Sequence, residues 1–167
     1  MIAKLSDGAT ENLRALRVAA AVRGRALPPL HGHITLASWL PEEDADFIGA
    51  CADIARAARP FSVVYTDLRV LHETSVIVAV PAPSPDLVRL HEAIASRFAC
   101  CLDRWTRGSE WLPHTTLLYA PGEDLEGICG RMRREFRPFE AKIDRIEFSR
   151  VLETGYSVIG SVGLSGT

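Results

Sequence analysis

The chain has 167 residues, of which 47% are hydrophobic and 24% are charged, and its formal net charge is −2. This composition is typical of a soluble globular protein, and the length predicts a single domain over residues 1–167. The near-neutral charge argues against a protein that holds long nucleic acid mainly through its phosphates, but it leaves small ligands or one end of an RNA open. The sequence has neither a membrane-spanning apolar run nor a secretory signal, so we expect a cytoplasmic protein with no membrane partner.

Helical and extended patterns alternate along the chain. Apolar residues at helical spacing predict four helices, from about residue 10 to 23, from 41 to 58, from 84 to 101 and from 123 to 136. Thr10, Pro41 and Ser84 are the predicted starting points of the first three helices. Strand-forming runs are predicted at 1–5, 31–38, 61–71, 75–80, 112–120, 143–151 and 156–164. Together these elements predict an α+β fold.

Three landmarks recur along the sequence in the same order. His33 recurs as His114, and the tripeptide Arg-Pro-Phe at 59–61 recurs at 137–139. Ser-Val-Ile at 75–77 recurs at 157–159. The separation between the two copies is nearly the same for all three landmarks, which predicts a duplicated unit. Because no linker rich in Pro, Gly or Ser separates the halves, we expect two pseudo-symmetric lobes that share a core around one cleft.

Two matching tripeptides are the strongest functional signal in the chain. They are His33-Ile34-Thr35, within HGHITLAS, and His114-Thr115-Thr116, within LPHTTLLYA. Residues two apart in a strand share a face, so each tripeptide presents an imidazole beside a hydroxyl. Two imidazoles can supply the base and the acid of a phosphodiester cleavage, and two hydroxyls can donate hydrogen bonds to the phosphate oxygens.

These two stretches resemble the paired H-x-T/S motifs of the 2H phosphoesterases, the group that includes 2′-5′ RNA ligase-like proteins and cyclic nucleotide phosphodiesterases. The resemblance implies a bilobal α+β fold, with two mainly antiparallel sheets flanked by helices and both motifs facing a central cleft. It also implies that His33 and His114 are the catalytic pair and that Thr35 and Thr116 bind the phosphate. It implies no metal or other cofactor.

The implied reaction is the opening of a 2′,3′-cyclic phosphate by water, or chemistry at a 2′-5′ linkage in RNA. The expected partner is therefore a nucleotide or an RNA end, bound by a monomer. Two alternatives remain open at this point. The same cleft could bind nucleotides without turnover, or His31 and His33, which have the spacing of metal ligands on a strand, could belong to a metallohydrolase.

Several other side chains are candidate substrate contacts, although packing or solvated roles are the more usual ones for such residues. His31 and Trp39 flank the first motif, and Arg104, Arg107 and Tyr119 flank or follow the second. Arg23 and Arg25 precede the first motif as Arg104 and Arg107 precede the second. The aromatic side chains of Trp105 and Trp111 could also stack on a base. His72 and His91 are predicted to be surface residues.

Overall fold

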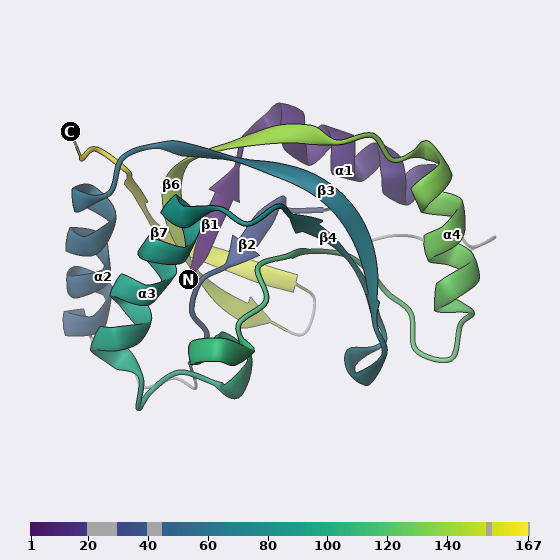
Figure 1. Ribbon diagram of the computed structural model, residues 1–167. Helices are drawn as coiled ribbons and strands as arrows, with labels where there is room; N and C mark the ends of the chain where they lie inside the picture. Colours follow the sequence, from purple (N-terminus) through teal and green to yellow (C-terminus); the bar gives the residue numbers. More distant parts are fainter. Residues whose placement is uncertain (20–29, 40–44, 153–154, 167) are drawn as a thin grey trace.

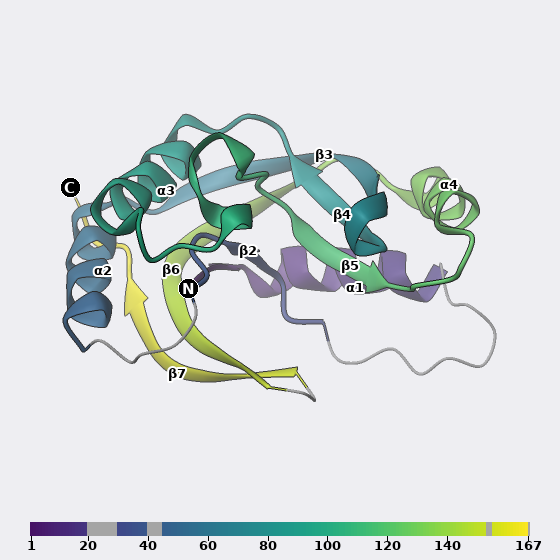
Figure 2. The ribbon, with the colours of Figure 1, turned by 90° about the horizontal axis from the view of Figure 1, so that it is seen from below.

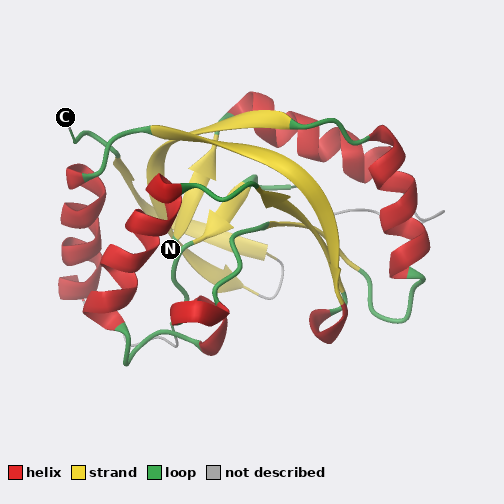
Figure 3. Cartoon of the chain, in the orientation of Figure 1, coloured by secondary structure: helices red, strands yellow, loops and turns green. Residues whose placement is uncertain are grey.

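The computed structural model describes residues 1–19, 30–39, 45–152 and 155–166. Within these residues the chain forms four helices and seven strands (Figures 1 and 3). The helices are α1 (Asp7–Ala19), α2 (Ala45–Ala57), α3 (Pro85–Phe98) and α4 (Leu125–Glu135). The strands are β1 (Ile2–Leu5), β2 (His33–Thr35), β3 (Phe61–Leu71), β4 (Val76–Pro81), β5 (Thr115–Tyr119), β6 (Phe139–Leu152) and β7 (Gly155–Gly163).

The seven strands pair in antiparallel fashion, which confirms the predicted α+β class. Their order is β2-β1-β6-β3-β4-β5, and β7 pairs with β6. The strands form one hydrogen-bonded sheet rather than two separate sheets, because β6 is long enough to pair with β3 near its start and with β1 and β7 further on. This long strand therefore connects the two ends of the molecule.

Exchanging β1 with β4, β2 with β5 and β3 with β6 gives the same six-strand order, read from the other end of the sheet. The strand β7, which pairs with β6, is not part of this exchange. The registers follow the same exchange, since Ile2 lies opposite Thr35 and Val78 lies opposite Thr116. At the centre Val63 of β3 pairs with Ala141 of β6, and these two residues have the same separation in the sequence as the two Arg-Pro-Phe tripeptides. These registers are consistent with the predicted duplication. They also make β4 the counterpart of β1, so the Ser-Val-Ile sequence in β7 is not the structural equivalent of the one at 75–77.

The helices pack in two pairs at opposite ends of the sheet (Figure 1). One pair consists of α1 and α4, and the other consists of α2 and α3. Each pair therefore takes one helix from each half of the sequence, and both halves contribute to both ends of the molecule. None of the described helices has the length and apolar character needed to cross a bilayer.

The predicted helix starts can be compared with the structure for the first and the third helix. Ser84 caps α3 by accepting a hydrogen bond from the Leu87 amide, and a proline follows it, as predicted. In contrast, α1 begins at Asp7, so Thr10 is not its cap but lies within the first turn, where its hydroxyl donates to the Ser6 carbonyl. The predicted start of the second helix at Pro41 lies outside the described residues.

Candidate active site

The two motif strands stand at opposite ends of the strand order, yet they lie side by side (Figure 2). Two hydrogen bonds from the second half of the chain connect them. The Thr115 hydroxyl donates to the His33 carbonyl at 2.7 Å, and the Trp111 indole N–H donates to the Thr35 carbonyl at 2.9 Å. The sheet thus curls until its two ends meet, and the two tripeptides meet there.

Both motif histidines are held in the same way. The His33 Nδ1 atom lies 2.8 Å from the carbonyl oxygen of His31, and the His114 Nδ1 atom lies 2.7 Å from that of Leu112. A carbonyl oxygen can only accept, so Nδ1 of each ring carries the proton and donates it. Each neutral ring therefore keeps its lone pair on Nε2, which is the nitrogen that can exchange a proton with a ligand.

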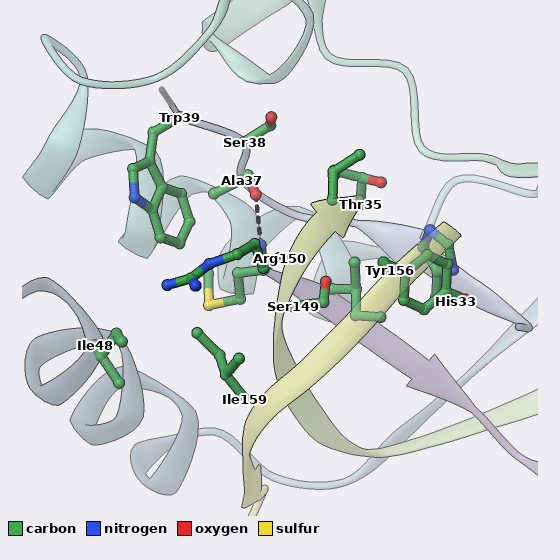
Figure 4. A pocket seen from close by; sticks show the side chains of 13 residues that line it. His33, Thr35, Ala37, Ser38, Trp39, Ile48, Ser149, Arg150, Tyr156 and Ile159 are labelled. Atoms are coloured by element: carbon green, nitrogen blue, oxygen red, sulfur yellow. Dashed lines mark hydrogen bonds between the residues drawn. The ribbon is translucent and has the colours of Figure 1, made fainter. Parts of the chain in front are cut away.

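The cleft between the motifs consists of two hollows that adjoin each other. The first, the His33 hollow, has a volume of about 430 Å³ and is lined by His33 and Thr35 (Figure 4). The second, the His114 hollow, has a volume of about 710 Å³ and is lined by His114 and Thr116. Thr35 and Ser38 line both hollows. The structure therefore places all four motif side chains in the walls of these two hollows, which share Thr35 and Ser38.

Burial keeps both imidazoles neutral near pH 7. Desolvation lowers the pKa of His33 from 6.5 to about 4, and the nearby His31 and His114 rings lower this pKa further, against the opposing effect of the Nδ1 hydrogen bond. Desolvation also lowers the pKa of His114. Since an adjacent anion favours the charged imidazolium, a bound phosphate will raise both pKa values. Both imidazoles can therefore act as bases near pH 7, and an anion beside them favours the protonated form.

His33 has neighbours that His114 lacks within the described structure. The His31 Nε2 atom lies 2.7 Å from the Glu147 carboxylate, and Glu147 is only 8% exposed. The ring of Tyr156 makes edge contacts with both His31 and His33, at centroid distances of 5.0 and 5.6 Å. Figure 4 shows Tyr156 beside His33 at one end of the hollow. No local pattern in the sequence points to this contact, because it depends on the β6–β7 hairpin folding back beside β2.

A second group of residues supports the backbone that follows Thr35. His91 of α3 is buried, and its Nδ1 atom lies 2.9 Å from the Leu36 carbonyl. Its ring stacks on Trp111 at a centroid distance of 3.8 Å. The prediction that His91 is a surface residue is therefore wrong. The signal was present in the sequence, because His91 stands four residues after Leu87 and three before Ile94 and so shares their apolar face.

The remaining predicted contacts lie mostly away from the cleft. Arg104 is exposed, stacks over Trp105 at 3.9 Å and faces Glu73 at 3.6 Å. Arg107 donates to the Leu102 carbonyl at 2.6 Å. Neither arginine lines a hollow.

The aromatic and histidine candidates differ in whether they line one of the two hollows. Trp39 does line the His33 hollow, where its ring also packs against Phe47 at 3.9 Å. The His31 ring lies 5.8 Å from the His33 ring and contacts Glu147, and Tyr119 is 61% exposed at the end of β5. Neither residue lines a hollow. Trp105 and Trp111 both line the His114 hollow. Arg23 and Arg25 lie outside the described residues.

The metal-site alternative requires further ligands around His31 and His33. Within the described residues, no group of three or more His, Cys, Asp or Glu side chains is arranged to hold a metal ion. The His31 ring, one of the two predicted ligands of that alternative, uses its Nε2 atom to contact Glu147 instead.

Solved structures share this fold closely. TT0787 of Thermus thermophilus superimposes with a TM-score of 0.70 at 20% sequence identity, over 99% of this chain and 96% of that chain. E. coli LigT complexed with 3′-AMP gives a TM-score of 0.70 at 19% identity, over 98% of this chain and 95% of that chain. LigT complexed with NADP⁺ gives 0.68 at 18% identity, with the same coverage. No curated protein is significantly similar in sequence.

The family assignment comes from the sequence itself. The model of the 2′-5′ RNA ligase superfamily matches residues 5–155, and this segment contains both histidine motifs, the long β6 strand and all four helices. Because the match extends over most of the chain, the protein belongs to the 2′-5′ RNA ligase superfamily and so to the 2H phosphoesterases.

Proposed function

We propose that the protein is a metal-independent phosphoesterase that acts on a 2′,3′-cyclic phosphate or a 2′-5′ phosphodiester of a nucleotide or an RNA end. The observation that carries this proposal is the matched pair of imidazoles, each with Nδ1–H held by a carbonyl and each beside a threonine hydroxyl in one cleft. The structures of LigT with 3′-AMP, NADP⁺ and ATP support a nucleotide ligand.

In the proposed hydrolysis, a water oxygen attacks phosphorus while Nε2 of one neutral histidine takes its proton. The other histidine, charged by the nearby phosphate, gives its Nε2 proton to the leaving ribose oxygen. The hydroxyls of Thr35 and Thr116 donate hydrogen bonds to the non-bridging oxygens, where negative charge increases in the transition state. His33 and His114 exchange roles when the reaction runs in reverse.

The test is hydrolysis of the four nucleoside 2′,3′-cyclic phosphates in the presence of EDTA, by the wild type and by His33→Ala and His114→Ala. Each variant should lose about 10²- to 10⁴-fold in kcat, because each lacks one proton-transfer group. Thermal melting checks that the variants are folded. A kcat close to that of the wild type in either folded variant would rule out the two-histidine mechanism. Loss of wild-type activity in EDTA would favour a metal-dependent mechanism.

The non-catalytic alternative is tested with the same proteins. If the wild type turns over none of these cyclic phosphates but binds nucleoside monophosphates in calorimetry, the cleft is a nucleotide-binding site without this activity. The isomer of any product shows which ribose oxygen leaves phosphorus.

A further inference from the structure

The hydroxyl of Ser38 lies at the boundary of the two hollows, because Ser38 lines both of them, as Thr35 does. The Ser38 side chain is half-buried, and no hydrogen bond among the described residues uses its hydroxyl. Figure 4 shows this hydroxyl directed away from Ile48 and Ile159, which also line the His33 hollow. The hydroxyl can therefore form a hydrogen bond with a ligand at the boundary.

The backbone bulges between Thr35 and Ser38. The amides of Leu36 and Ala37 both donate to the Met1 carbonyl, at 3.0 and 3.2 Å. Two consecutive residues opposite one partner form a β-bulge, which shifts the alternation of faces by one residue. Leu36 and Ala37 accordingly are both buried, at 0% and 1% exposure. Ser38 thus lies on the same face as Thr35, about 7 Å further along the chain.

The segment that follows α3 holds both backbone groups of Ser38. The Asp103 amide donates to the Ser38 carbonyl at 2.8 Å, and the Ser38 amide donates to the Thr106 hydroxyl at 3.1 Å. The buried Thr106 hydroxyl in turn donates to the Asp103 carboxylate at 2.9 Å. These three hydrogen bonds form a closed ring, which fixes the backbone that carries the Ser38 hydroxyl.

The second motif has a different residue at the equivalent position. The offset between Thr35 and Thr116 makes Tyr119 the counterpart of Ser38. Tyr119 is 61% exposed and lines neither hollow. The Ser38 hydroxyl therefore belongs to the first motif alone, and the two motif strands offer a ligand different contacts beyond their threonines.

The position and the chemistry of Ser38 suit the sugar of a nucleotide. His33 and Thr35 precede Ser38 on the same face, so a phosphate between the motifs leaves Ser38 beside the group that is esterified to it. A serine hydroxyl both donates and accepts hydrogen bonds, as the hydroxyls of ribose do. On the basis of the proposed function, we propose that the Ser38 hydroxyl binds a ribose oxygen of the nucleotide and that Thr106 is the positioning residue for Ser38.

Calorimetry tests this contact independently of turnover, with inorganic phosphate, adenosine 3′-phosphate and cytidine 3′-phosphate as ligands. Ser38→Ala should lower the affinity for both nucleotides about fivefold, because one neutral hydrogen bond is lost. The affinity for inorganic phosphate should stay within about twofold of the wild-type value, since the phosphate-binding side chains are intact. Tyr119→Phe removes the hydroxyl at the counterpart position and is the matched control, which should leave all three affinities unchanged.

The positioning role of Thr106 is tested through Ser38. Thr106→Val removes the acceptor of the Ser38 amide and should lower nucleotide affinity about as much as Ser38→Ala, whereas Thr106→Ser retains the hydroxyl and should bind like the wild type. In the Ser38→Ala background, Thr106→Val should cause no further loss, because the group that Thr106 positions is absent. Thermal melting checks that the variants are folded, and if Thr106→Val is not, Ser38→Ala alone decides the contact.

Each alternative outcome has a definite meaning. Unchanged nucleotide affinity in folded Ser38→Ala overturns the proposed contact. An equal loss for all three ligands shows that Ser38 binds the phosphate, and a loss confined to one nucleotide shows that it contacts the base; both results contradict the assignment to the sugar. A loss in Thr106→Val that persists in the Ser38→Ala background contradicts the positioning role.

The same measurements separate this inference from the proposed function. If the wild type binds both nucleotides with the expected dependence on Ser38 but hydrolyses no cyclic phosphate, the proposed function fails and the Ser38 contact stands. If the wild type hydrolyses cyclic phosphates and Ser38→Ala leaves nucleotide affinity unchanged, the proposed function stands and the Ser38 contact fails. Absence of nucleotide binding by the wild type overturns the Ser38 contact as well.

Discussion

Thr115, the middle residue of the second motif, donates a hydrogen bond to the carbonyl of His33, the first residue of the first motif. The same Thr115 hydroxyl lies 2.6 Å from the Tyr65 hydroxyl, and both side chains are fully buried. Burial raises the pKa of Tyr65, so its hydroxyl stays protonated and donates to Thr115. This chain of two hydrogen bonds ties the backbone of one motif to the side chain of the other.

Replacing Thr115 should therefore affect both stability and rate. Thr115→Val keeps the volume but leaves the Tyr65 hydroxyl and the His33 carbonyl without this partner, which should cost about 1–3 kcal/mol in the free energy of unfolding. Release of the His33 backbone should also lower kcat by about tenfold, because the reaction depends on the relative position of the two rings. Urea unfolding and steady-state kinetics measure the two effects. Thr115→Ser retains the hydroxyl and is the control; equal losses in both variants would mean that the hydrogen bonds are not responsible.

The indole of Trp111 offers a separate test of how the first motif is held. Trp111→Phe keeps a ring beside His91 but removes the N–H that donates to the Thr35 carbonyl. We expect a decrease of about 0.5–1.5 kcal/mol in stability and a lower kcat, since Thr35 loses a backbone support. Trp105→Phe is the matched control, because Trp105 lines the same hollow and donates to no β2 carbonyl among the described hydrogen bonds. A kcat loss as large in the control as in Trp111→Phe would assign the effect to the hollow and not to the backbone.

The motif tripeptides could be found in the sequence because their signal is local. A strand alternates its faces, so His33 and Thr35 share one face and the buried Ile34 takes the other. The order of the motifs in a repeated chain then predicts that they face each other. The helical stripes and the strand-forming runs are local in the same sense, and the α+β class follows from them.

The rest of the site depends on contacts between distant parts of the chain. Tyr156 and Glu147 reach the first motif only because β6 pairs with β1 and β7 pairs with β6. Tyr119 follows His114 by five residues, which places it about 16 Å further along the strand and out of reach of the phosphate. Arg104 and Arg107 lie in a loop, where sequence position does not fix the direction of a side chain, and they bind Glu73 and the Leu102 carbonyl instead.

The buried histidines should make stability depend on pH. The pKa of His33 is about 4 in the folded protein and near 6.5 when the chain is unfolded, so between these values the unfolded chain binds more protons. The contribution of neutral His33 to the free energy of unfolding is thus fully present above pH 6.5. It is lost as the pH falls toward 4, by about 3 kcal/mol in total. His91 and His114, whose pKa values are also lowered, act in the same direction. Urea unfolding at pH 7 and pH 5 should show a loss that is smaller in His33→Gln; an unchanged loss in that variant would contradict the assignment.

The contact between His31 and Glu147 predicts a positioning effect on His33. The His31 carbonyl accepts the His33 Nδ1–H and so selects the His33 tautomer with its proton on Nδ1. The Glu147 carboxylate contacts the His31 ring, and we therefore expect it to hold His31 in the position that this hydrogen bond requires. Glu147→Gln should therefore lower kcat more than it raises KM, and it should increase the fraction of His33 protonated on Nε2, which ¹⁵N NMR of the imidazole detects. The matched control is Glu126→Gln, which removes the carboxylate of an exposed His–Glu pair at His72. If Glu147→Gln changes only thermal stability and leaves the His33 tautomer and kcat as in the control, Glu147 has a purely structural role.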